Sequence, residues 1–556
     1  MQSSLQATDL LPRIPLTAQT ILDVGCGRGA LAAAFRPFNP KARLLGIDRD
    51  PEAANLAALH MDQVAAVDVE IDPLPFDVPE GIDCIIYKNI LEHLRDPWAL
   101  IRRHAEALSA DGVMLICVPN FEYWRFTEQL LRGTWDEEEA GRRRWFNPDR
   151  IRQQLRLAGL TLCDVIPHET DAAAAAGFAE ALAPGLSALG IDPQAYQRRA
   201  AGSHSIWRVR KEPIQRMILA GNMLTPVGGV SHVRVVHPLQ AVGTDPAVSA
   251  GVTDRVDMGQ SADGTPRIFV LHRPALIGEQ GLSMLRMLTE AGYLIVTEFD
   301  DHPDHFDMMR MGGALTFLGV HAIQTSTTAL AEVLRKYNPE IAVFPNALAS
   351  LPEVRNFADP HSITLFFGAL NRERDWGPFI QPINAVAAMA GERLKFQVVH
   401  DQGFFDALQT PHKTFTPTCD YETYMRILGG SEVSFMPLSD TPFNRAKSDL
   451  KFIEAASCRV ATLASTVVYG NSIDDGRTGL LFRDPVEFHA RLLRLVAMPD
   501  LARDLGNAAR QYVSDERMLA YQVAPRIAWY RLLWARRDAL TAALRIRMQQ
   551  QFQSAA

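Results

Sequence analysis

A glycine-rich turn near the N-terminus constrains the fold of this chain more than any other feature. Residues 21–31 read Ile-Leu-Asp-Val-Gly-Cys-Gly-Arg-Gly-Ala-Leu. The apolar residues 21–24 predict a short buried strand, and residues 30–35 predict the beginning of a helix. Glycines between a strand and a helix allow the backbone to approach a ligand where a Cβ atom would intrude. The turn therefore predicts a Rossmann-like α/β domain that binds a ligand at the carboxyl ends of its strands.

Two acidic residues follow the turn at the predicted ends of further strands. Asp48 ends the predicted strand 44–47, and a carboxylate about 20 residues beyond a glycine turn suits a ribose diol. Asp68 follows a third apolar run, where its carboxylate can accept a hydrogen bond from an adenine amine. Both positions indicate a ligand that contains a nucleoside.

The negative charge of Asp23, just before the glycines, helps to distinguish between two nucleoside-containing ligands, NAD and S-adenosylmethionine. Gly25, Gly27 and Ala30 fit the spacing of dinucleotide-binding turns, which keeps NAD as an alternative. Asp23, however, lies just before them, and its negative charge would repel a pyrophosphate. The same charge would attract the amino group and the sulfonium of S-adenosylmethionine, which we therefore expect as the ligand.

The order of these motifs resembles class I methyltransferases of the methyltransferase-11/12 type over roughly residues 15–165. The shared pattern is Asp-x-Gly-x-Gly-x-Gly at 23–29, two acidic strand ends and Leu-Glu-His at 91–93. His93 can act as a general base toward an acceptor hydroxyl, because imidazole titrates near neutral pH, or it can simply pack its helix. The resemblance implies that S-adenosylmethionine is bound by Asp23, Gly25, Gly27, Gly29, Asp48 and Asp68.

An aromatic and arginine-rich segment, residues 121–154, follows the predicted Rossmann core. It contains Trp135 and the run Arg142-Arg143-Arg144. The segment can cover an acceptor whose phosphate or carboxylate binds the arginines, or it can be a solvated helix face with an aromatic anchor. The sequence favours neither interpretation.

The length of 556 residues predicts about three or four domains, all of the α/β class. We expect a methyltransferase domain at 1–170 and an Ala-rich helical linker at 171–213. Two further Rossmann-like lobes, at 214–360 and 361–514, are expected to form a GT-B fold. Residues 515–556 have helical periodicity and are expected either to pack back on the first of these lobes or to form a basic tail.

A predicted helix near residue 447 carries the chemistry of the last α/β block. Lys447 and Lys451 lie one turn apart at its N-terminus, with Ser448 between them. The helix dipole, the free N–H groups and two ammonium charges together form an anion site that suits a diphosphate. Glu454, one turn further along, can bind a ribose diol.

Residues 215–530 resemble the GT-B glycosyltransferases of family 4. The shared features are Gly228-Gly229, Phe-Pro-Asn-Ala at 344–347, the helix around 451–455 and Asp-Gly-x-Thr-Gly-Leu-Leu at 475–481. The resemblance implies a nucleotide-sugar donor in the second lobe and an acceptor in the first. Lys447 and Lys451 would be catalytic, because they would stabilise the leaving diphosphate without a metal. The implied donor-binding residues are Gly229, Asn371, Arg372, Arg374, Lys447, Ser448, Lys451 and Glu454.

The chain departs from this family pattern at two places. The first glutamate of the family's Glu-x7-Glu would fall on Ala446. The family's diphosphate-binding Gly-Arg-Leu-x-x-x-Lys has Ala369 in place of its arginine and Arg374 in place of its lysine, with Arg372 nearby. Donor binding is therefore still expected, but through a redistributed set of cations.

Composition narrows the expected partners and compartment. The net charge of −8 gives no electrostatic footprint for nucleic acid, so no nucleic-acid partner is expected. The acidic and histidine-rich loop 300–305 superficially resembles a metal site, but we expect no metal there. The six cysteines form no Cys-x-x-Cys pair, and the sequence has no signal-like segment or long apolar run. These features favour a cytoplasmic protein.

The C-terminal segment raises a question about membranes. Six arginines face one aspartate between residues 525 and 548. Such a face can hold a protein at the inner surface of an anionic membrane, near a lipid-linked acceptor. A solvated basic face is the preferred interpretation.

Together these patterns predict a bifunctional enzyme that methylates an acceptor with S-adenosylmethionine and transfers a sugar from a nucleotide-sugar donor. Surface or secreted glycan biosynthesis is the expected context. The main alternative is an active methyltransferase whose GT-B part is a non-catalytic carbohydrate- or nucleotide-binding module. A GT-B-like epimerase is a third hypothesis, less favoured because no acid and base residues can be assigned to it.

Overall fold

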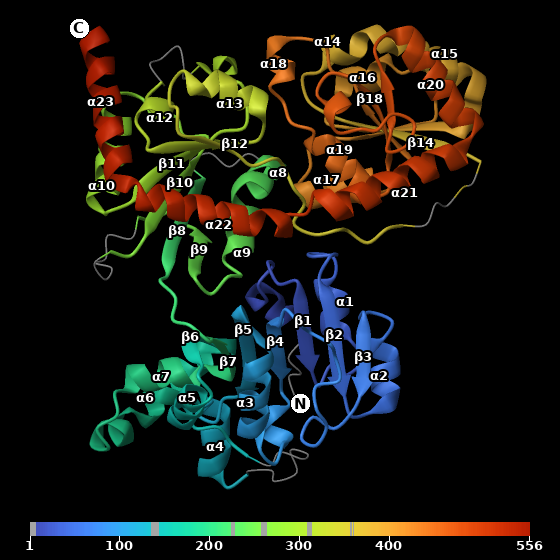
Figure 1. Cartoon of the computed structure of the whole chain (residues 1–556). Helices are drawn as coiled ribbons and strands as arrows, with labels where there is room; N and C mark the ends of the chain where they lie inside the picture. Colours follow the sequence, from blue (N-terminus) through green and yellow to red (C-terminus); the bar gives the residue numbers. More distant parts are fainter. Residues whose placement is uncertain are drawn as a thin grey trace. The chain divides into compact units, whose positions relative to one another are not determined.

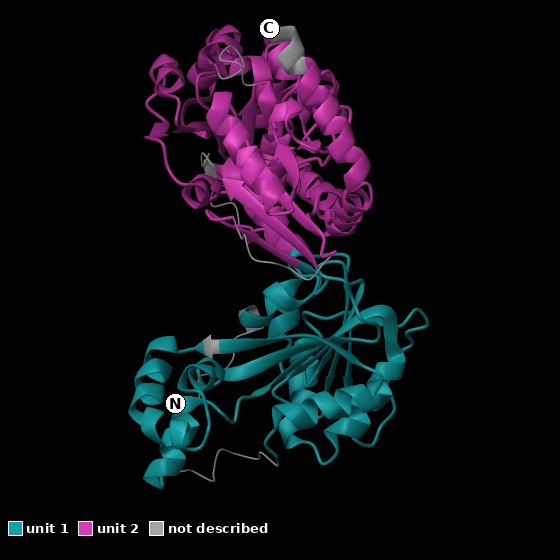
Figure 2. Ribbon diagram, turned by 90° about the vertical axis from the view of Figure 1, so that its left-hand side faces the viewer, with its two compact units in different colours: residues 1–216, 243–248 teal, residues 217–242, 249–556 magenta. Residues whose placement is uncertain are grey.

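The computed structural model describes residues 7–134, 144–223, 228–256, 264–307, 314–355, 359 and 361–555. Trp135, Arg142 and Arg143, which the sequence suggests as part of an acceptor cover, lie outside these ranges. The chain forms two compact units (Figure 2). Unit 1 comprises residues 1–216 and 243–248, and unit 2 comprises residues 217–242 and 249–556.

Unit 1 is built on one seven-stranded sheet with the strand order β3-β2-β1-β4-β5-β7-β6 (Figure 1). The first five strands pair in parallel, with Ile21 of β1 opposite both Leu44 of β2 and Cys84 of β4. β7 pairs antiparallel with both β5 and β6. The strands are β1 (Thr20–Val24), β2 (Arg43–Asp48), β3 (Gln63–Ala66), β4 (Ile82–Lys88), β5 (Leu108–Pro119), β6 (Thr161–Thr170) and β7 (Gly202–Arg210).

Four helices of unit 1 begin with an Asp or Asn cap followed by proline. The capping side chains of Asp50, Asp96, Asn147 and Asp192 accept hydrogen bonds from the first backbone N–H groups of their helices. Proline is favoured next because its fixed φ suits the first turn, where no N–H donor is needed. The helices are η1 (Ala7–Arg13), α1 (Ala30–Phe35), α2 (Pro51–Ala57), η2 (Leu91–His93), α3 (Pro97–Ala107), α4 (Trp124–Arg132), α5 (Pro148–Leu157), α6 (Ala172–Ala188) and α7 (Pro193–Ala200).

The segment expected to be a linker, residues 171–213, is part of unit 1. β7 lies between β5 and β6, and its Trp207 and Val209 belong to the core cluster that also contains Leu22 of β1. α6 and α7 pack together through Ala179 and Tyr196. The linker prediction is wrong because the pairing of β7 depends on strands far away in the sequence, which the local composition does not reveal.

Unit 2 contains two six-stranded sheets, one in each of two lobes. Their strand orders are β13-β12-β11-β10-β8-β9 and β16-β15-β14-β17-β18-β19. In the first lobe, β8, β10, β11, β12 and β13 pair in parallel with their neighbours. In the second lobe, all six strands pair in parallel. Two parallel α/β lobes are the GT-B-like arrangement, and the predicted fold class is confirmed.

The first lobe holds the strands β8 (Met217–Met223), β9 (Val248–Val252), β10 (Arg267–His272), β11 (Leu294–Glu298), β12 (Ala322–Thr325) and β13 (Ile341–Val343). Its helices are α8 (Gly228–Ser231), η3 (His232–Val236), α9 (His237–Val242), α10 (Gly278–Glu290), η4 (Pro303–His305), α12 (Leu315–Leu318) and α13 (Thr328–Arg335).

The second lobe holds the strands β14 (Ile363–Gly368), β15 (Leu394–Val399), β16 (Lys413–Thr416), β17 (Val433–Met436), β18 (Ala461–Ser465) and β19 (Leu480–Phe482). Its helices are α14 (Glu373–Trp376), η5 (Gly377–Phe379), α15 (Ile380–Ala390), η6 (Gly391–Arg393), α16 (Gln402–Ala407), α17 (Tyr421–Leu428), α18 (Pro442–Arg445), α19 (Leu450–Ser457), η7 (Tyr469–Asn471), α20 (Pro485–Ala497) and α21 (Pro499–Glu516).

The C-terminal helices α22 (Ala520–Ala535) and α23 (Arg537–Ala555) lie against the first lobe (Figure 1). The Tyr530 hydroxyl donates to Gln324 Oε1 at 2.6 Å. Several arginines of this segment are used within the unit: Arg536 pairs with Glu340 at 2.9 Å, and Arg547 donates to the carbonyl oxygen of Val320 at 2.7 Å. These contacts leave fewer cations for an external surface than the sequence count suggests.

None of the helices that the structure describes combines the length and the apolarity that crossing a membrane would require.

A buried charge network holds α22 and the first lobe together. Arg234 of η3 and Glu298 of β11 are both almost fully buried, and Arg234 Nε lies 2.9 Å from Glu298 Oε1. Gln324 Nε2 donates to Glu298 Oε2 at 2.7 Å, and Gln324 in turn accepts from Tyr530. Burial raises the pKa of Glu298, and Arg234 opposes that shift. The carboxylate therefore depends on Arg234 for its charge balance.

We expect the substitution Arg234→Met to destabilise unit 2 strongly. Breaking a buried ion pair leaves an uncompensated charge and costs about 3–5 kcal/mol of unfolding free energy. Urea unfolding curves recorded by fluorescence, together with calorimetric melting curves, measure the change in the free energy of unfolding. Arg286→Met is the matched control, because Arg286 pairs with Glu279 at an exposed surface. Equal unfolding free energies for the two variants would contradict the role given to Arg234.

Candidate functional sites

The predicted glycine turn has the backbone conformation that its sequence requires. Gly25, Gly27 and Gly29 have φ values of +78°, +53° and +79°. A Cβ atom on Gly25 would lie 2.8 Å from Ile90 Cδ1, and one on Gly29 would lie 2.9 Å from the Cα atom of Ala57. A side chain is therefore disfavoured by conformation at all three glycines, and by close neighbours at Gly25 and Gly29 but not at Gly27.

Asp48 fastens the turn to the end of β2. Its Oδ2 accepts from the Gly27 N–H group at 2.9 Å, and its Oδ1 accepts from the Asp50 N–H group at 3.0 Å. The N–H groups of Gly25 and Cys26 donate to the Ile47 carbonyl at 2.7 and 3.0 Å. A carboxylate offers about four lone-pair sites, so Asp48 keeps acceptor capacity for a ligand.

A cavity of about 680 Å³ opens at the carboxyl ends of β1, β2, β3 and β4 in unit 1. It brings together four predicted site residues, Gly25, Asp48, Asp68 and His93. Gly27 and Gly29 are not among its lining residues. The lining residues that carry charge are Asp48, Asp68, Glu70, Arg49, Lys88 and Arg95.

Asp23 lies away from this cavity lining. Its side chain is 6% exposed and, with Ile21 and Leu31, lines a separate small cavity that is mostly apolar. Burial raises the pKa of Asp23 to about 7, with Lys88 opposing the shift and Asp48 adding to it. Direct binding of a ligand by Asp23 stays a prediction.

The rim of the cavity is fixed by two charged side chains. Glu70 Oε1 accepts from the N–H groups of Arg95 and Asp96 at 2.7 and 3.0 Å. Arg144 donates to the carbonyl oxygens of Leu94 and Arg95. Arg144 thus stabilises the rim, and both interpretations of segment 121–154 stay predictions. The sequence reasoning missed Glu70, although it follows a strand end like Asp68.

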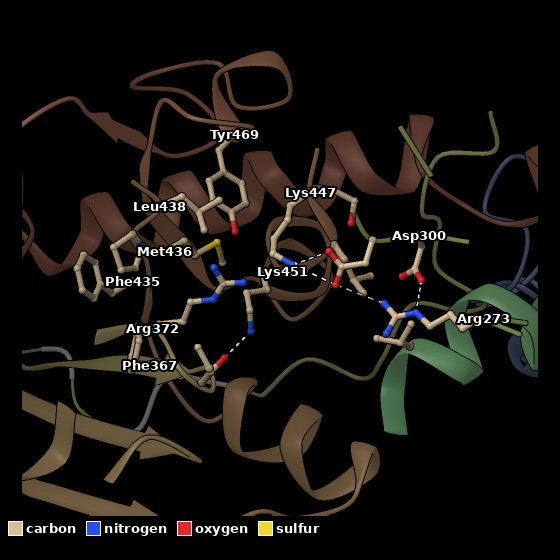
Figure 3. Close-up of a pocket in the computed structure, with 17 residues that line it drawn as sticks. Arg273, Asp300, Phe367, Arg372, Phe435, Met436, Leu438, Lys447, Lys451 and Tyr469 are labelled. Atoms are coloured by element: carbon tan, nitrogen blue, oxygen red, sulfur yellow. Dashed lines mark hydrogen bonds and ion pairs between the residues drawn. The ribbon is translucent and has the colours of Figure 1, made fainter. Parts of the chain in front are cut away.

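A second cavity, of about 290 Å³, lies in unit 2 and is lined by both lobes (Figure 3). It gathers four of the predicted donor-binding residues, Arg372, Lys447, Ser448 and Lys451. The remaining lining residues are Val230, Arg273, Asp300, Asp301, Phe367, Gly368, Ala369, Phe435, Met436, Pro437, Leu438, Leu450 and Tyr469.

The two lysines of this cavity occupy different environments. Lys451, in the first turn of α19, donates to the Gly368 carbonyl, and burial lowers its pKa to about 8. Lys447 precedes the helix, and its Nζ lies 3.2 Å from Asp301 Oδ1. Burial also lowers the pKa of Lys447, although Asp301 opposes the shift. Lys447 thus faces a carboxylate that lines the cavity, whereas the carboxylate that acts on Lys451, and opposes the lowering of its pKa, is Glu454 outside the cavity lining.

Arg372 is held in place by two acceptors. Its Nη1 donates to Asp375 Oδ2 at 2.9 Å and to Asn444 Oδ1 at 3.0 Å. The neighbouring Asn371 and Arg374 are exposed and do not line the cavity. Of the cations expected in this segment, the structure brings only Arg372 to the site.

Gly229 and Glu454 both contact Tyr421, and neither lines the cavity of unit 2. The Tyr421 hydroxyl donates to Glu454 Oε1 at 2.9 Å, and a Cβ on Gly229 would lie 2.6 Å from Tyr421 Cδ2. Burial raises the pKa of Glu454 to about 7. Ala446 is buried in the core of the first lobe, so its position supplies no carboxylate. Ribose binding by Glu454 stays a prediction.

Three charged residues of the cavity, Arg273, Asp300 and Asp301, are not part of the donor site predicted from the sequence. Arg273, at the end of β10, pairs with Asp300 at 2.6 Å and approaches Asp301 at 3.7 Å. The described residues contain no group of three or more His, Cys, Asp or Glu side chains that could hold a metal ion. The two carboxylates at the start of loop 300–305 pair with cations of the protein: Asp300 with Arg273 and Asp301 with Lys447.

Comparisons with known proteins agree with the two halves of the chain. Residues 3–165 match a family model described as a methyltransferase domain, and residues 377–525 match one described as glycosyl transferase-like. Both predicted resemblances are confirmed at this level.

The curated relatives of this chain include two O-methyltransferases that match less than a third of it. The ubiquinone biosynthesis O-methyltransferase of Xanthomonas campestris pv. campestris (strain B100) is 32% identical over 167 residues, which cover 28% of this chain and 67% of that protein. The corresponding protein of Rhodopseudomonas palustris (strain BisB5) is 30% identical over 170 residues, 27% of this chain and 61% of that protein.

Among solved structures, sucrose-phosphate synthase from Thermosynechococcus elongatus shares 15% identity and covers 58% of this chain and 100% of its own, with a TM-score of 0.41.

The pKa of Lys451 predicts how anion binding depends on pH. The ammonium is charged below a pKa of about 8, so affinity for a nucleoside diphosphate is expected to be present below pH 8 and to fall above it. The fall approaches about tenfold per pH unit, the limit for loss of one proton. Calorimetric titration with UDP, GDP and ADP between pH 7 and 9.5 measures it.

Lys451→Arg is the control for this pH dependence, because guanidinium stays charged over the whole range. Its affinity is expected to vary little between pH 7 and 9.5. The same decline in the wild type and in the arginine variant would assign the pH dependence to another group.

Proposed function

Because the chain belongs to the methyltransferase family over residues 3–165 and has a glycosyl transferase-like domain over residues 377–525, we propose that it is a bifunctional transferase. Unit 1 methylates an acceptor with S-adenosylmethionine, and unit 2 transfers a sugar from a nucleotide-sugar donor. The acceptor is a small molecule or glycan, free or lipid-linked, that becomes part of a surface or secreted glycan.

The contrast in charge between the two cavities carries this proposal. The cavity of unit 1 has three carboxylates (Asp48, Asp68, Glu70) and three cations (Arg49, Lys88, Arg95). Such a balance suits a zwitterion like S-adenosylmethionine, which has two positive groups and one carboxylate. The cavity of unit 2 has four cations (Arg273, Arg372, Lys447, Lys451) against two carboxylates (Asp300, Asp301). That excess suits the diphosphate of a nucleotide sugar.

The residues of unit 1 fit S-adenosylmethionine in two respects. The turn at Gly25 has no room for a side chain, and Asp48 presents a carboxylate that is already fixed by two backbone N–H groups. The cofactor supplies a methyl group on an electrophilic sulfonium, so the protein chiefly has to hold the acceptor in line. His93 lines the same cavity and is available to accept a proton from an acceptor hydroxyl.

The residues of unit 2 fit the departure of a nucleoside diphosphate. Lys451, Lys447 and Arg372 place three cations on one side of the cavity (Figure 3). Cations that are fixed before the reaction stabilise the charge that develops on the leaving diphosphate. No proton transfer to the leaving group is then required.

A binding module is the second candidate for unit 2. Ala446 offers no carboxylate, and Arg374 lies outside the cavity. Both observations favour a lobe that binds a nucleotide or carbohydrate without turning it over. Release of nucleoside diphosphate from a nucleotide sugar, with and without added acceptors, separates transfer from binding alone.

Ligand-induced thermal stabilisation, measured by calorimetry, tests the two sites independently. A ligand at about 100 times its dissociation constant stabilises the state that binds it by about 2.7 kcal/mol. We expect S-adenosylmethionine to stabilise the wild type but not Asp48→Ala. One class of nucleotide sugar should stabilise the wild type but not the double variant Lys447→Ala/Lys451→Ala.

Each variant is the control for the other ligand. Asp48→Ala should retain stabilisation by the nucleotide sugar, and the double lysine variant should retain stabilisation by S-adenosylmethionine. Loss of both responses in one variant would mean that the substitution unfolds more than its own unit. If no nucleotide or nucleotide sugar stabilises the wild type, the glycosyltransferase half of the proposal fails.

A further inference from the structure

Lys447 and Asp301 form an ion pair across the cavity of unit 2. Lys447 Nζ lies 3.2 Å from Asp301 Oδ1 and 3.4 Å from Oδ2. The two side chains are only 21% and 14% exposed, so water screens the pair weakly. Lys447 comes from the second lobe and Asp301 from the loop after β11 in the first. The pair therefore joins the two walls of the cavity.

Asp300 and Asp301 are adjacent but are bound differently. Arg273 Nε donates to Asp300 Oδ1 at 2.6 Å, and although burial opposes it, this contact keeps the pKa of Asp300 below its usual range. Arg273 reaches Asp301 only at 3.7 Å. Asp300 is thus paired with Arg273. Asp301 accepts from the His302 N–H group at 3.0 Å, and its closest charged partner is Lys447 at 3.2 Å.

A diphosphate would compete with Asp301 for the same ammonium group. Arg372 and Lys451 line the cavity on the side of Lys447, and neither forms an ion pair with Asp301 (Figure 3). A ligand with at least two negative charges that contacts all three cations gains more than a single carboxylate can offer. Lys447 would then leave Asp301 for the phosphate.

Once Lys447 has left it, the Asp301 carboxylate can accept hydrogen bonds from the ligand. Ionised Asp301 accepts hydrogen bonds but cannot donate them, and the hydroxyl groups of a sugar are donors that lie next to the diphosphate in a nucleotide sugar. A sugar hydroxyl can therefore replace the ammonium group that Asp301 loses. A bare nucleoside diphosphate has hydroxyl groups only on its ribose, and none beyond the terminal phosphate where the sugar of the donor would lie.

We propose that Asp301 is a specificity-determining residue of the donor site, which pairs with Lys447 before the donor binds and with sugar hydroxyls when the donor is bound. This assignment rests on the proposed nucleotide-sugar function. Asp301 lowers the affinity for the nucleoside diphosphate, because the diphosphate must break the ion pair without compensation. The nucleotide sugar also breaks the ion pair, but the hydrogen bonds from its sugar hydroxyls to Asp301 compensate for the lost binding free energy. The residue thereby favours the donor over the product that transfer leaves behind.

Binding measurements on Asp301→Asn test the assignment. The substitution removes the charge that competes for Lys447 and weakens the acceptor of the sugar hydroxyls. We expect the nucleoside diphosphate to bind about five- to tenfold more tightly, and the corresponding nucleotide sugar to gain nothing or to bind more weakly. Titration calorimetry with UDP and UDP-glucose, GDP and GDP-mannose, and ADP and ADP-glucose gives both constants. Asp301→Ser should change the ratio in the same direction.

Two further variants separate this role from a structural one. Asp304→Asn is the matched control, because Asp304 belongs to the same loop but its side chain is 67% exposed. It should leave both constants unchanged. In the Lys447→Met background, Asp301→Asn should no longer tighten the binding of the nucleoside diphosphate, because the ion pair is already absent.

Three outcomes would overturn the assignment. Unchanged or weaker binding of the nucleoside diphosphate by Asp301→Asn would refute the competition with Lys447. A gain that persists in the Lys447→Met background would show that the ion pair is not its cause. If the wild type binds neither nucleotides nor nucleotide sugars, the proposed function fails and this assignment fails with it.

Discussion

The organisation of unit 2 depends on hydrogen bonds made by one buried side chain, that of Asn346. Its Oδ1 accepts from Arg234 Nη1 at 2.8 Å, and its Nδ2 donates to Ser448 Oγ at 2.7 Å. Arg234 belongs to the first lobe, whereas Ser448 lies in the cavity next to Lys447. The amide therefore connects the buried ion pair of one lobe to the cationic wall of the other. An amide suits this position because it offers both an acceptor and donors.

The C-terminal part of the chain strengthens the same junction. Arg517 forms a two-pronged contact with the carboxylate of Asp449, the residue before α19, at 2.6 and 2.8 Å. Arg517 Nη2 also donates to the carbonyl oxygen of Asn346 at 3.0 Å. Bidentate contacts of this kind fix direction as well as distance. The direction of α19, and with it the position of Lys451, is thus set by residues more than sixty positions away in the sequence.

The part of the site that could be predicted from the sequence is the part that local geometry determines. The turn at Gly25, Gly27 and Gly29 needs positive φ values, and only glycine adopts these readily, so the letters alone indicate the conformation. A lysine in the first turn of a helix was also predictable, and Lys451 lies there in α19. The prediction that Lys447 begins the same helix is wrong, because Lys447 lies in the segment before α19. The glycine turn and the place of Lys451 require no knowledge of distant contacts.

The remaining features depend on contacts that local patterns do not contain. Asp301 and Lys447 are 146 positions apart, and only the meeting of the two lobes makes them partners. The local composition around β7 predicts a linker because the antiparallel pairing of β7 with β5 is non-local. Asp23 precedes the glycines as expected, but it belongs to the strand face that packs with Ile21 and Leu31. Motif spacing fixes its place along the chain, whereas strand register decides which face it occupies.

The two cavities show how one type of scaffold is adapted to ligands of different charge. Each cavity lies where parallel strands end, so the backbone offers both sites a similar edge. In unit 1 the strand ends carry Asp48 and, just beyond β3, Asp68, which suits hydroxyl and amine donors. In unit 2 the ligand side is formed by Lys447 and Lys451 at a helix N-terminus, where the dipole adds to their charge. The difference in charge between the two cavities thus follows from a few side chains at equivalent edges, while the sheets behind them stay alike.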